Sequence, residues 1–207
     1  MRVAIGNLTD LPRLEAAQGP PAEGTQARLL RFATERRRWQ GALARRLASI
    51  AAGAVLGVAC PVGDIEEDGR QTGVRVRSAP ALSLSLSHRG ALAVAACDAT
   101  RCGVDVEICR ERADLAEAAE LAFGVERAAW VLGVATPTER QERFHVLWTL
   151  VESAWKAGTD LHIDGHGARA QLRVTRGGAP VPWWTRRLGD YRVTAVGGGS
   201  VPQLVDC

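Results

Sequence analysis

The stretch SLSLSHRGALAVAACDATRCGVDVEI, residues 83–108, decides the fold. Serine and leucine alternate at its start and apolar residues fill the remainder, which predicts three short strands separated by tight links. On the first strand the two residue types divide between two faces, with Leu82, Leu84 and Leu86 on one and Ser83, Ser85 and Ser87 on the other. The short links favour an antiparallel meander.

Segments with the period of an α-helix lie on both sides of these strands. Residues 28–57 carry apolar residues on one face and arginines on the other. The helical period returns over residues 113–157, with an interruption at Thr136-Pro137-Thr138.

Two further strands are predicted near the end of the chain, over residues 170–176 and 190–197, around an irregular segment at Trp183-Trp184. Residues 15–26 and 60–73 are rich in Gly, Pro or polar residues and are predicted to be loops. The order helix, strands, helices, strands favours an α+β domain over a doubly wound parallel sheet.

The composition is that of a globular protein, either one domain or two small lobes packed as one unit. Of the 207 residues 46% are hydrophobic, and the net charge is +3, which allows acidic partners without requiring a nucleic acid or an anionic membrane. No membrane-spanning run or signal-peptide pattern occurs. The five cysteines show no Cys-x-x-Cys spacing. We therefore expect a reduced, cytoplasmic protein.

The pentapeptide GVDVE, residues 103–107, places two carboxylates together. On a strand, Asp105 and Glu107 project from the same face. Neighbouring carboxylates repel each other and are easier to keep ionised around a cation, and hard oxygen ligands suit Mg²⁺. The alternative, which the pentapeptide alone favours, is the solvated outer face of an edge strand.

The segment LWTLVESAWKAG, residues 147–158, contains Lys156, the one lysine among 26 lysines and arginines. In a helix, Glu152 and Lys156 stand at i and i+4, a pairing that stabilises the helix slightly. Arginine would serve that pairing equally well. An ammonium group is a compact point charge that suits a phosphate oxygen in a tight space. The lone lysine therefore indicates a selected geometry, with helix pairing or chance as the alternative.

Further candidates for anion binding lie at a turn and on the first predicted helix. His88 ends the first strand at a hairpin, where its ring and the Ser87 hydroxyl can face a ligand; capping of the turn is the alternative. Arg36, Arg37 and Arg38 lie about two turns before Arg45 and Arg46. Such a cluster can grip phosphates, but it can equally be a solvated face or a patch that contacts nucleic acid or an acidic protein.

Taken together, three motifs in this order resemble those of the Sfp-type phosphopantetheinyl transferases. SLSHRG (85–90) resembles the element Ser-x-Ser-His-x-Gly, and GVDVE resembles Gly-[Ile/Val]-Asp-x-Glu. WTLVESAWKA (148–157) resembles Trp-[Ser/Thr]-x-Lys-Glu-[Ser/Ala]-x-x-Lys-Ala, with Val151 in place of the first lysine. Asp105 and Glu152 are 47 residues apart, within the family's usual range. The resemblance runs from about residue 30 to residue 197.

The resemblance implies transfer of the 4′-phosphopantetheine arm of coenzyme A to a serine of an apo acyl or peptidyl carrier protein, with release of 3′,5′-ADP. The reaction would depend on Mg²⁺ or Mn²⁺. Asp105, Glu107 and Glu152 would hold the metal, and Glu152 would also be the general base on the carrier serine. Lys156 and His88 would contact the phosphates, and the nucleotide end would be bound by Ser87, Arg45 and Arg38.

The resemblance also implies a pseudo-dimeric fold of two similar αβ lobes in one monomeric chain. The lobes would comprise residues 1–98 and 99–207, with a seam near residues 98–104 and the active site at their interface. No nucleic acid and no membrane is expected as a partner.

The chain departs from the family pattern at several positions. Val151 replaces a lysine, and Arg89 replaces the small serine that usually follows the histidine. The family's upstream Gly-Lys-Pro element is not visible; Gly69-Arg70 is the nearest substitute, with Arg75 and Arg77 as rivals. Glu126 is an outside candidate for the general base.

Two other functions stay open. Val151 motivates a degenerate homologue that binds coenzyme A or a carrier protein without transfer. The arginines from Arg36 to Arg46 motivate a nucleic-acid-binding protein, which would bind any duplex with a steep salt dependence.

Overall fold

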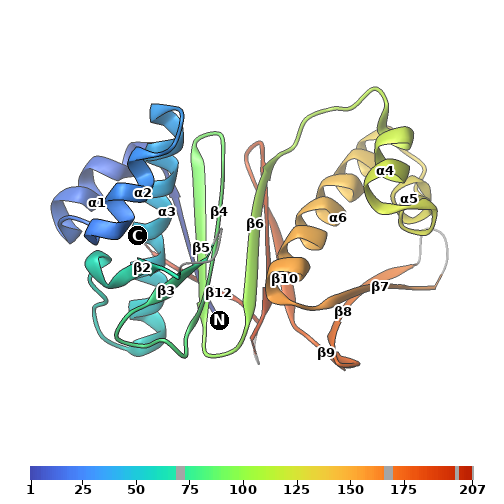
Figure 1. The fold of residues 1–207 in the computed structure, drawn as a ribbon. Helices are drawn as coiled ribbons and strands as arrows, with labels where there is room; N and C mark the ends of the chain where they lie inside the picture. The colour runs from blue at the N-terminus through green and yellow to red at the C-terminus, as the bar shows by residue number, and fades with distance from the viewer. Residues whose placement is uncertain (69–72, 166–169, 199–200, 207) are drawn as a thin grey trace.

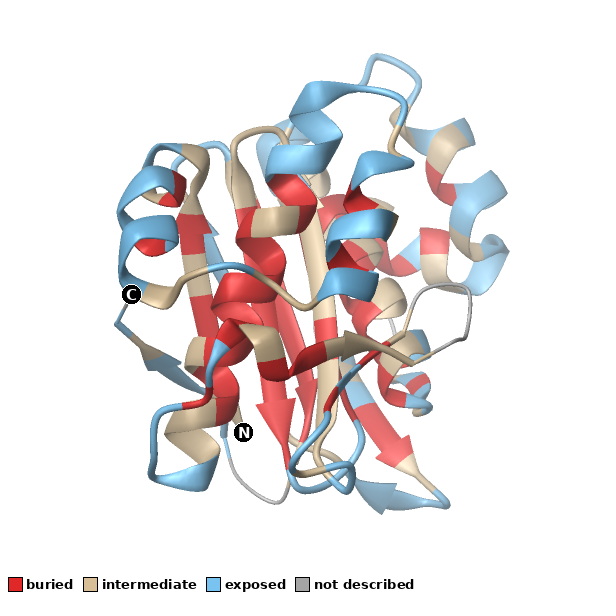
Figure 2. Cartoon of the chain, turned by 60° about the vertical axis from the view of Figure 1, so that its left-hand side comes forward, coloured by how far each residue is buried: buried red, intermediate tan, exposed pale blue. Residues whose placement is uncertain are grey.

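The computed structural model describes residues 1–207 except 69–72, 166–169, 199–200 and 207. Two main β-sheets stand side by side, and a long helix covers the outer side of each (Figure 1). The most deeply buried residues lie on the central strands and on the helix faces packed against them (Figure 2). The predicted α+β class is confirmed.

The first sheet has the strand order β12-β1-β5-β4, comprising β1 (Arg2–Asn7), β4 (Ser83–Arg89), β5 (Leu92–Asp98) and β12 (Gln203–Val205). Strand β12 returns from the end of the chain and pairs parallel with β1. Helix α3 (Glu35–Leu56) packs on this sheet. The contact is close because both sides of it are rich in buried alanines, including Ala48 and Ala51 of α3 and Ala93 and Ala95 of β5.

The predicted helix over residues 28–57 is two helices. Helix α2 (Glu23–Leu30) ends before α3 begins, because the Thr34 side chain accepts a hydrogen bond from the Arg37 N–H and caps the new helix. Helix α1 (Leu11–Gln18) follows a 3₁₀ turn, η1 (Leu8–Asp10). The predicted loop over residues 15–26 is therefore wrong where it overlaps α1 and α2, whose buried leucines pack against the core.

The second sheet has the order β10-β11-β6, all antiparallel, with β6 (Cys102–Ile108), β10 (Trp183–Leu188) and β11 (Tyr191–Gly197). Helix α6 (Pro137–Ala157) packs on it. Helices α4 (Leu115–Phe123) and α5 (Val125–Leu132) lie beyond α6. The irregular Trp183-Trp184 segment that the sequence predicts is wrong, because both residues pair with β11 as part of a strand.

Helix α6 confirms the helical period predicted for its segment and has clear ends. Thr136 and Glu139 form a capping box at its start, with Pro137 in the first turn. Gly158 ends it in the left-handed conformation, with a φ of 63°. These capping residues set the two ends of α6 and thereby the position of its last turn, which carries Glu152 and Lys156.

The remaining elements form two small sheets. One pairs β2 (Ile65–Glu67) with β3 (Val74–Val76) after the 3₁₀ turn η2 (Val62–Asp64), so part of the loop predicted over 60–73 is a strand. The other contains β7 (Asp160–Asp164), β8 (Gln171–Arg176) and β9 (Ala179–Pro180). Strand β8 confirms the prediction over residues 170–176.

The antiparallel meander predicted over residues 83–108 is wrong in its last step. Strands β4 and β5 form the expected antiparallel hairpin. Strand β6, however, pairs along its whole length with β11 in the other sheet. The chain therefore passes from the first sheet to the second between Asp98 and Cys102.

Strands β4 and β6 are joined by serine side chains. The N–H groups of β6 donate to serine hydroxyls of β4 at three alternate positions: Cys102 N to Ser83 Oγ (3.1 Å), Val104 N to Ser85 Oγ (3.0 Å) and Val106 N to Ser87 Oγ (3.3 Å). We call this the serine ladder. It explains the alternation in the sequence, because the leucines of β4 pack into the first core while the serines connect the two sheets.

Ser85→Ala is expected to destabilise the protein by about 1–3 kcal/mol. Ser85 is buried and Val104 is fully buried, so removal of the hydroxyl leaves the Val104 N–H without a partner or access to water. Urea unfolding measures the change. Thr138→Ala, which removes a hydroxyl from an exposed residue, is the control and should cost much less. Equal stability of the two variants would contradict the importance of the ladder.

Candidate active site

Asp105 lies at the junction of the two sheets, where the serine ladder meets helix α6. Its Oδ1 accepts hydrogen bonds from Ser87 Oγ (2.8 Å) and from Lys156 Nζ (2.9 Å). The residue is 5% exposed, and its Oδ2 is buried without a hydrogen-bond partner among the described residues. A buried carboxylate oxygen in this situation is expected to have a partner, and a cation is one that suits it.

Glu107 of β6 lies close enough to Asp105 of the same strand and to Glu152 of α6 to be affected by their charges. Burial raises the pKa of Glu107, and the charges of Asp105 and Glu152 raise it further, against the opposing effect of Arg89. Arg89 forms an ion pair with Glu107, with 3.0 Å between Nε and Oε2. The Glu107 carboxylate is therefore repelled by the other two, and a bound cation would reduce this repulsion.

The three carboxylates do not yet form a compact ligand set. Within the described part of the chain, no three His, Cys, Asp or Glu side chains lie close enough together to hold a metal ion. The predicted ligands Asp105 and Glu107 are neutralised by Lys156 and Arg89. A metal site here requires the longer side chains of Glu107 and Glu152 to turn toward Asp105 Oδ2.

Lys156 joins helix α6 to strand β6. Its ammonium donates to the Val104 carbonyl (3.0 Å) as well as to Asp105. The pairing with Glu152 that helical spacing suggests is thus replaced by a contact between two elements. An ammonium group has three donors, so one remains for a ligand.

Lys156 and His88 both line a cleft with a volume of about 1020 Å³. The serine-bearing strand β4 contributes every residue from Ser83 to His88 to its wall, and further cations come from Arg37, Arg75 and Arg101. A cleft of this size and charge suits an anionic ligand as large as a nucleotide. The predicted residues His88, Ser87 and Lys156 are thus brought together.

His88 is mostly buried in this cleft, and its Nδ1 has no hydrogen-bond partner among the described residues. Burial lowers the pKa of His88, and the charges of Arg37, Arg45 and Lys156 lower it further. The ring is therefore neutral at pH 7 and can accept or donate one hydrogen bond through each nitrogen, depending on its tautomer.

This lowered pKa predicts a loss of stability in mild acid. Below the ordinary value of 6.5 the unfolded chain binds a proton at His88, whereas the native protein does so only at lower pH. The free energy of unfolding should therefore fall as the pH drops below about 6.5. Urea unfolding of the wild type and of His88→Gln at about pH 7.5 and 5.5 measures this. The variant should lose less stability between the two values, and an equal loss in both proteins would contradict the assignment.

Arg45 and Arg38, which were predicted to bind the nucleotide end of coenzyme A, have different surroundings. Arg45 lines the cleft with Ser87, His88 and Lys156. It is also buried, and its guanidinium donates to Glu67 Oε1 (2.8 and 2.6 Å) and to the Gly41 carbonyl (3.1 Å), so it connects α3 to β2. Arg38 donates to the Phe32 carbonyl and is not among the residues that line the cleft. Its neighbour Arg37 does line the cleft, because consecutive helix positions point about 100° apart.

The candidates for the missing Gly-Lys-Pro element can be compared in part. Gly69-Arg70 lies outside the described residues. Arg75 lines the cleft and pairs with Glu66. Arg77 instead pairs with Asp64 and Glu66, and it does not belong to the cleft lining. Of the two rivals, Arg75 is the better placed.

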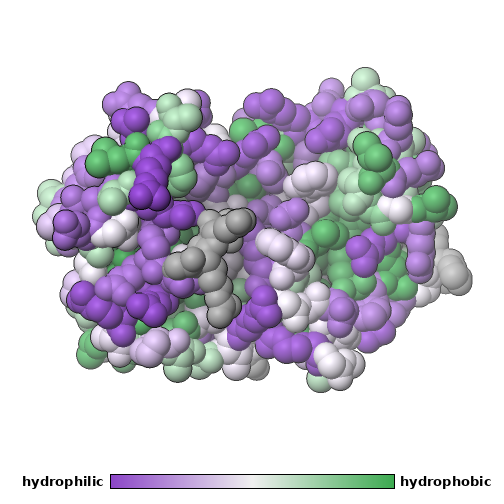
Figure 3. All heavy atoms as spheres, in the orientation of Figure 1, coloured by the Kyte–Doolittle hydropathy of each residue, from purple (hydrophilic) through white to green (hydrophobic). Residues whose placement is uncertain are grey.

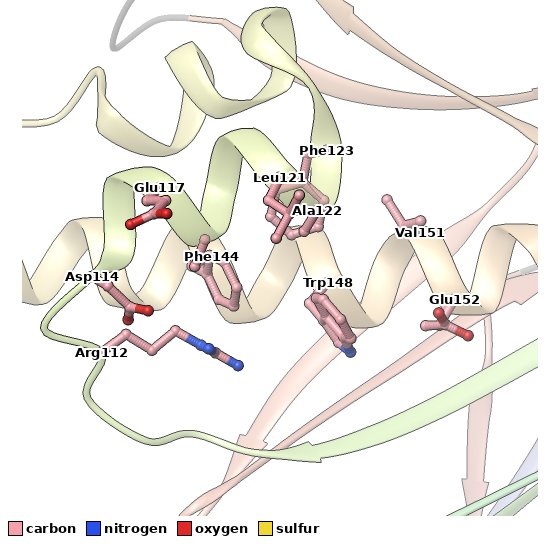
Figure 4. A pocket seen from close by; sticks show the side chains of 11 residues that line it. Arg112, Asp114, Glu117, Leu121, Ala122, Phe123, Phe144, Trp148, Val151 and Glu152 are labelled. Carbon is pink, nitrogen blue, oxygen red and sulfur yellow. The ribbon is translucent and has the colours of Figure 1, made fainter.

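A second, mostly apolar cavity of about 470 Å³ adjoins Glu152. Leu121 and Phe123 of α4 and Phe144 and Trp148 of α6 contribute to it, and Figure 4 shows Glu152 at one end. Apolar side chains also gather on the surface over α4–α6 in Figure 3. Val151, the departure from the family motif, lines this cavity, whereas Glu126 does not line it.

Arg101 and Trp155 are among the cleft residues that sequence reasoning did not identify. Arg101 lies in the link between β5 and β6, and Trp155 precedes Lys156 on α6. The position of Trp155 beside the lone lysine was the available signal, but an aromatic residue on a helix usually belongs to the core. Nothing in the sequence identified Arg101 as a cleft residue, because one arginine among many is not distinctive.

None of the helices in the described part of the chain has the length and apolar character needed to span a membrane. No protein-family model matches the chain, and no curated protein matches it.

Proposed function

We propose that this chain transfers the 4′-phosphopantetheine arm of coenzyme A to a serine of an acyl or peptidyl carrier protein. One observation carries the proposal: Ser87, His88 and Lys156 line one cation-rich cleft of nucleotide size, and both Ser87 and Lys156 donate hydrogen bonds to Asp105. The order of the three sequence motifs adds support, because they contribute Ser87 and His88, Asp105 and Glu107, and Glu152 and Lys156 to this one region.

The donor set suits Mg²⁺ or Mn²⁺ in this reaction. Asp105, through its buried and unpartnered Oδ2, would hold the ion together with Glu107 and Glu152. When bound, the ion would neutralise negative charge on the diphosphate of coenzyme A. Lys156 adds a positive charge on the same side, because its ammonium reaches Asp105 from α6.

The chemistry left to the side chains is proton transfer and alignment. Glu152 accepts the proton of the carrier serine hydroxyl. The serine oxygen forms a bond to the phosphorus that carries the pantetheine arm. The bond from that phosphorus to the bridging oxygen breaks, and 3′,5′-ADP leaves with the electron pair. His88 and Lys156 position and neutralise the phosphates, because both line the cleft.

The fold expected with this function is two similar αβ lobes, residues 1–98 and 99–207, with the active site between them. Two features support it: each main sheet is backed by one long helix, and the candidate site draws Ser87 and His88 from the first sheet and Asp105 and Glu107 from the second. A monomer acting in the cytoplasm is part of the same proposal.

A binding-only homologue is the second candidate, and Val151 favours it. The family motif has a lysine at this position, and Val151 instead lines the apolar cavity beside Glu152. If that lysine is needed for transfer, the chain binds coenzyme A or a carrier protein without modifying it. Arg89, which pairs with Glu107, is the cation placed to compensate.

Incubation with coenzyme A, Mg²⁺ and a panel of apo-carrier proteins distinguishes the two candidates. We expect intact-mass spectrometry to show the gain of one phosphopantetheine group on at least one carrier, with formation of 3′,5′-ADP. A carrier whose acceptor serine is replaced by alanine is the control and should gain no mass. Tight binding of coenzyme A with no mass gain on any carrier would favour the binding-only homologue.

Lys156→Arg is expected to raise the KM for coenzyme A about tenfold or more, with a smaller effect on kcat. The ammonium fits between the Val104 carbonyl and Asp105, and the larger planar guanidinium cannot keep both contacts and still present a donor to the phosphate. Steady-state kinetics measure the effect. Arg173→Lys, at an exposed ion pair with Asp164, is the matched control. Wild-type kinetics in Lys156→Arg would contradict a specific role of the ammonium group, and codon usage would then explain the single lysine.

A further inference from the structure

Trp155 is a large aromatic side chain that the fold leaves in solvent. It is 71% exposed, although its neighbour Ala154 and the nearby Ser153 and Ala157 are buried against the sheet. The side chain lines the cleft together with Lys156, from the last turn of α6. An exposed tryptophan on the wall of a ligand-sized cleft is a surface on which a flat ring can stack.

Two cations line the cleft together with Trp155. Lys156 is next in the chain, with its ammonium on Asp105. The guanidinium of Arg101 lies against Gly158, since a Cβ placed at that glycine would be 2.6 Å from Arg101 Nη1. Both cations line the same cleft as Trp155. The ligand that this arrangement suits carries negative charges close to an aromatic ring.

The positions and partners of Arg45 and Arg101 indicate which end of the cleft binds the aromatic ring of the ligand. Arg45, which also lines the cleft, already donates its guanidinium hydrogens to Glu67 and to the Gly41 carbonyl. Arg101 is exposed and lies at the Ser83 end of β4, because the Cys102 N–H donates to Ser83 Oγ. The wall from Ser83 to His88 is roughly 17 Å long, at about 3.4 Å for each of its residue steps. A ligand group beside Arg101 would therefore lie at the Ser83 end of this wall, and a group beside His88 at the other end.

We propose that Trp155 is the stacking surface for the adenine base of coenzyme A, with Arg101 beside it as a partner for a phosphate of the same nucleotide. This inference rests on the proposed function, because it takes coenzyme A as the ligand. It places the adenine base at the last turn of α6, and Arg45 keeps its hydrogen bonds to Glu67. Stacking on an aromatic side chain strengthens binding about five- to a hundredfold for each base.

Calorimetric titration with two fragments of coenzyme A tests the proposal. 3′,5′-ADP contains the base, and 4′-phosphopantetheine lacks it. Trp155→Ala should weaken binding of 3′,5′-ADP at least about fivefold and leave binding of 4′-phosphopantetheine unchanged. Trp155→Phe, which keeps an aromatic face, should retain most of the affinity. Trp39→Ala removes another exposed tryptophan that does not line the cleft, and it should bind like the wild type.

The outcomes separate this inference from the proposed function. Failure of the wild type to bind 3′,5′-ADP or coenzyme A would overturn both. Wild-type affinity for 3′,5′-ADP in Trp155→Ala, with transfer intact, would overturn the stacking role alone. A rise in the KM for the carrier protein, with the KM for coenzyme A unchanged, would assign Trp155 to the acceptor surface and would also overturn it. A rise in the KM for coenzyme A alone supports the inference.

Discussion

Asp105→Asn is expected to lower kcat/KM for phosphopantetheine transfer by about 100- to 1000-fold. The substitution keeps the size of the side chain and an oxygen that can accept from Ser87 and Lys156. It removes the negative charge, and with it the buried oxygen available to a divalent cation. Since transfer depends on neutralising the diphosphate, the loss should appear in the chemical step and should persist at high Mg²⁺.

The control for this variant is Asp164→Asn. Asp164 is an exposed carboxylate on β7, paired with Arg173 and outside the cleft, so its amide should leave transfer unchanged. Thermal unfolding confirms that Asp105→Asn is folded at the assay temperature. Transfer by Asp105→Asn at the wild-type rate would remove this carboxylate from the mechanism.

Gly103→Ala is expected to destabilise the protein by about 3 kcal/mol or more. A Cβ at this position would lie 2.0 Å from the Ser153 carbonyl oxygen, 2.8 Å from the Ala157 nitrogen and 3.0 Å from Lys156 Cβ. Two of these atoms are backbone, so the clash is relieved only if α6 moves away from β6. That movement would also displace Lys156 from Asp105.

Urea unfolding measures the effect, and Gly24→Ala is the matched control. Gly24 lies in helix α2, where an added Cβ meets no atom within 4 Å. Alanine is the better helix former by about 1 kcal/mol, so the control should be as stable as the wild type or slightly more stable. Similar stability of Gly103→Ala and Gly24→Ala would show that the approach of α6 to β6 is not tight.

The local structure could be predicted from the sequence where the signal was local. Alternating serine and leucine predicted β4, and the interruption at Thr136-Pro137-Thr138 marked the start of α6. The partner of β6 could not be predicted in this way. Its apolar alternation fits either neighbour, and the choice of β11 over β5 depends on residues about 90 positions away in the chain.

The candidate site, like the fold, could be predicted from the sequence only where the signal was local. The spacing of Asp105 and Glu107 on one strand, and of Glu152 and Lys156 on one helix, was readable. That Lys156 pairs with Asp105 rather than with Glu152 depends on how α6 lies across β6, which no local pattern records. The ion pair between Arg45 and Glu67 could not be predicted for the same reason, because the two residues lie on different elements.

The most direct test of the central claim, that three carboxylates hold a divalent ion against the diphosphate, is an anomalous difference map from crystals grown with Mn²⁺ and coenzyme A. We predict one strong peak about 2.1 Å from Asp105 Oδ2, with oxygens of Glu107, Glu152 and the diphosphate around it. Coenzyme A bound in the cleft with no metal peak among these carboxylates, or with the peak elsewhere on the chain, would contradict the account.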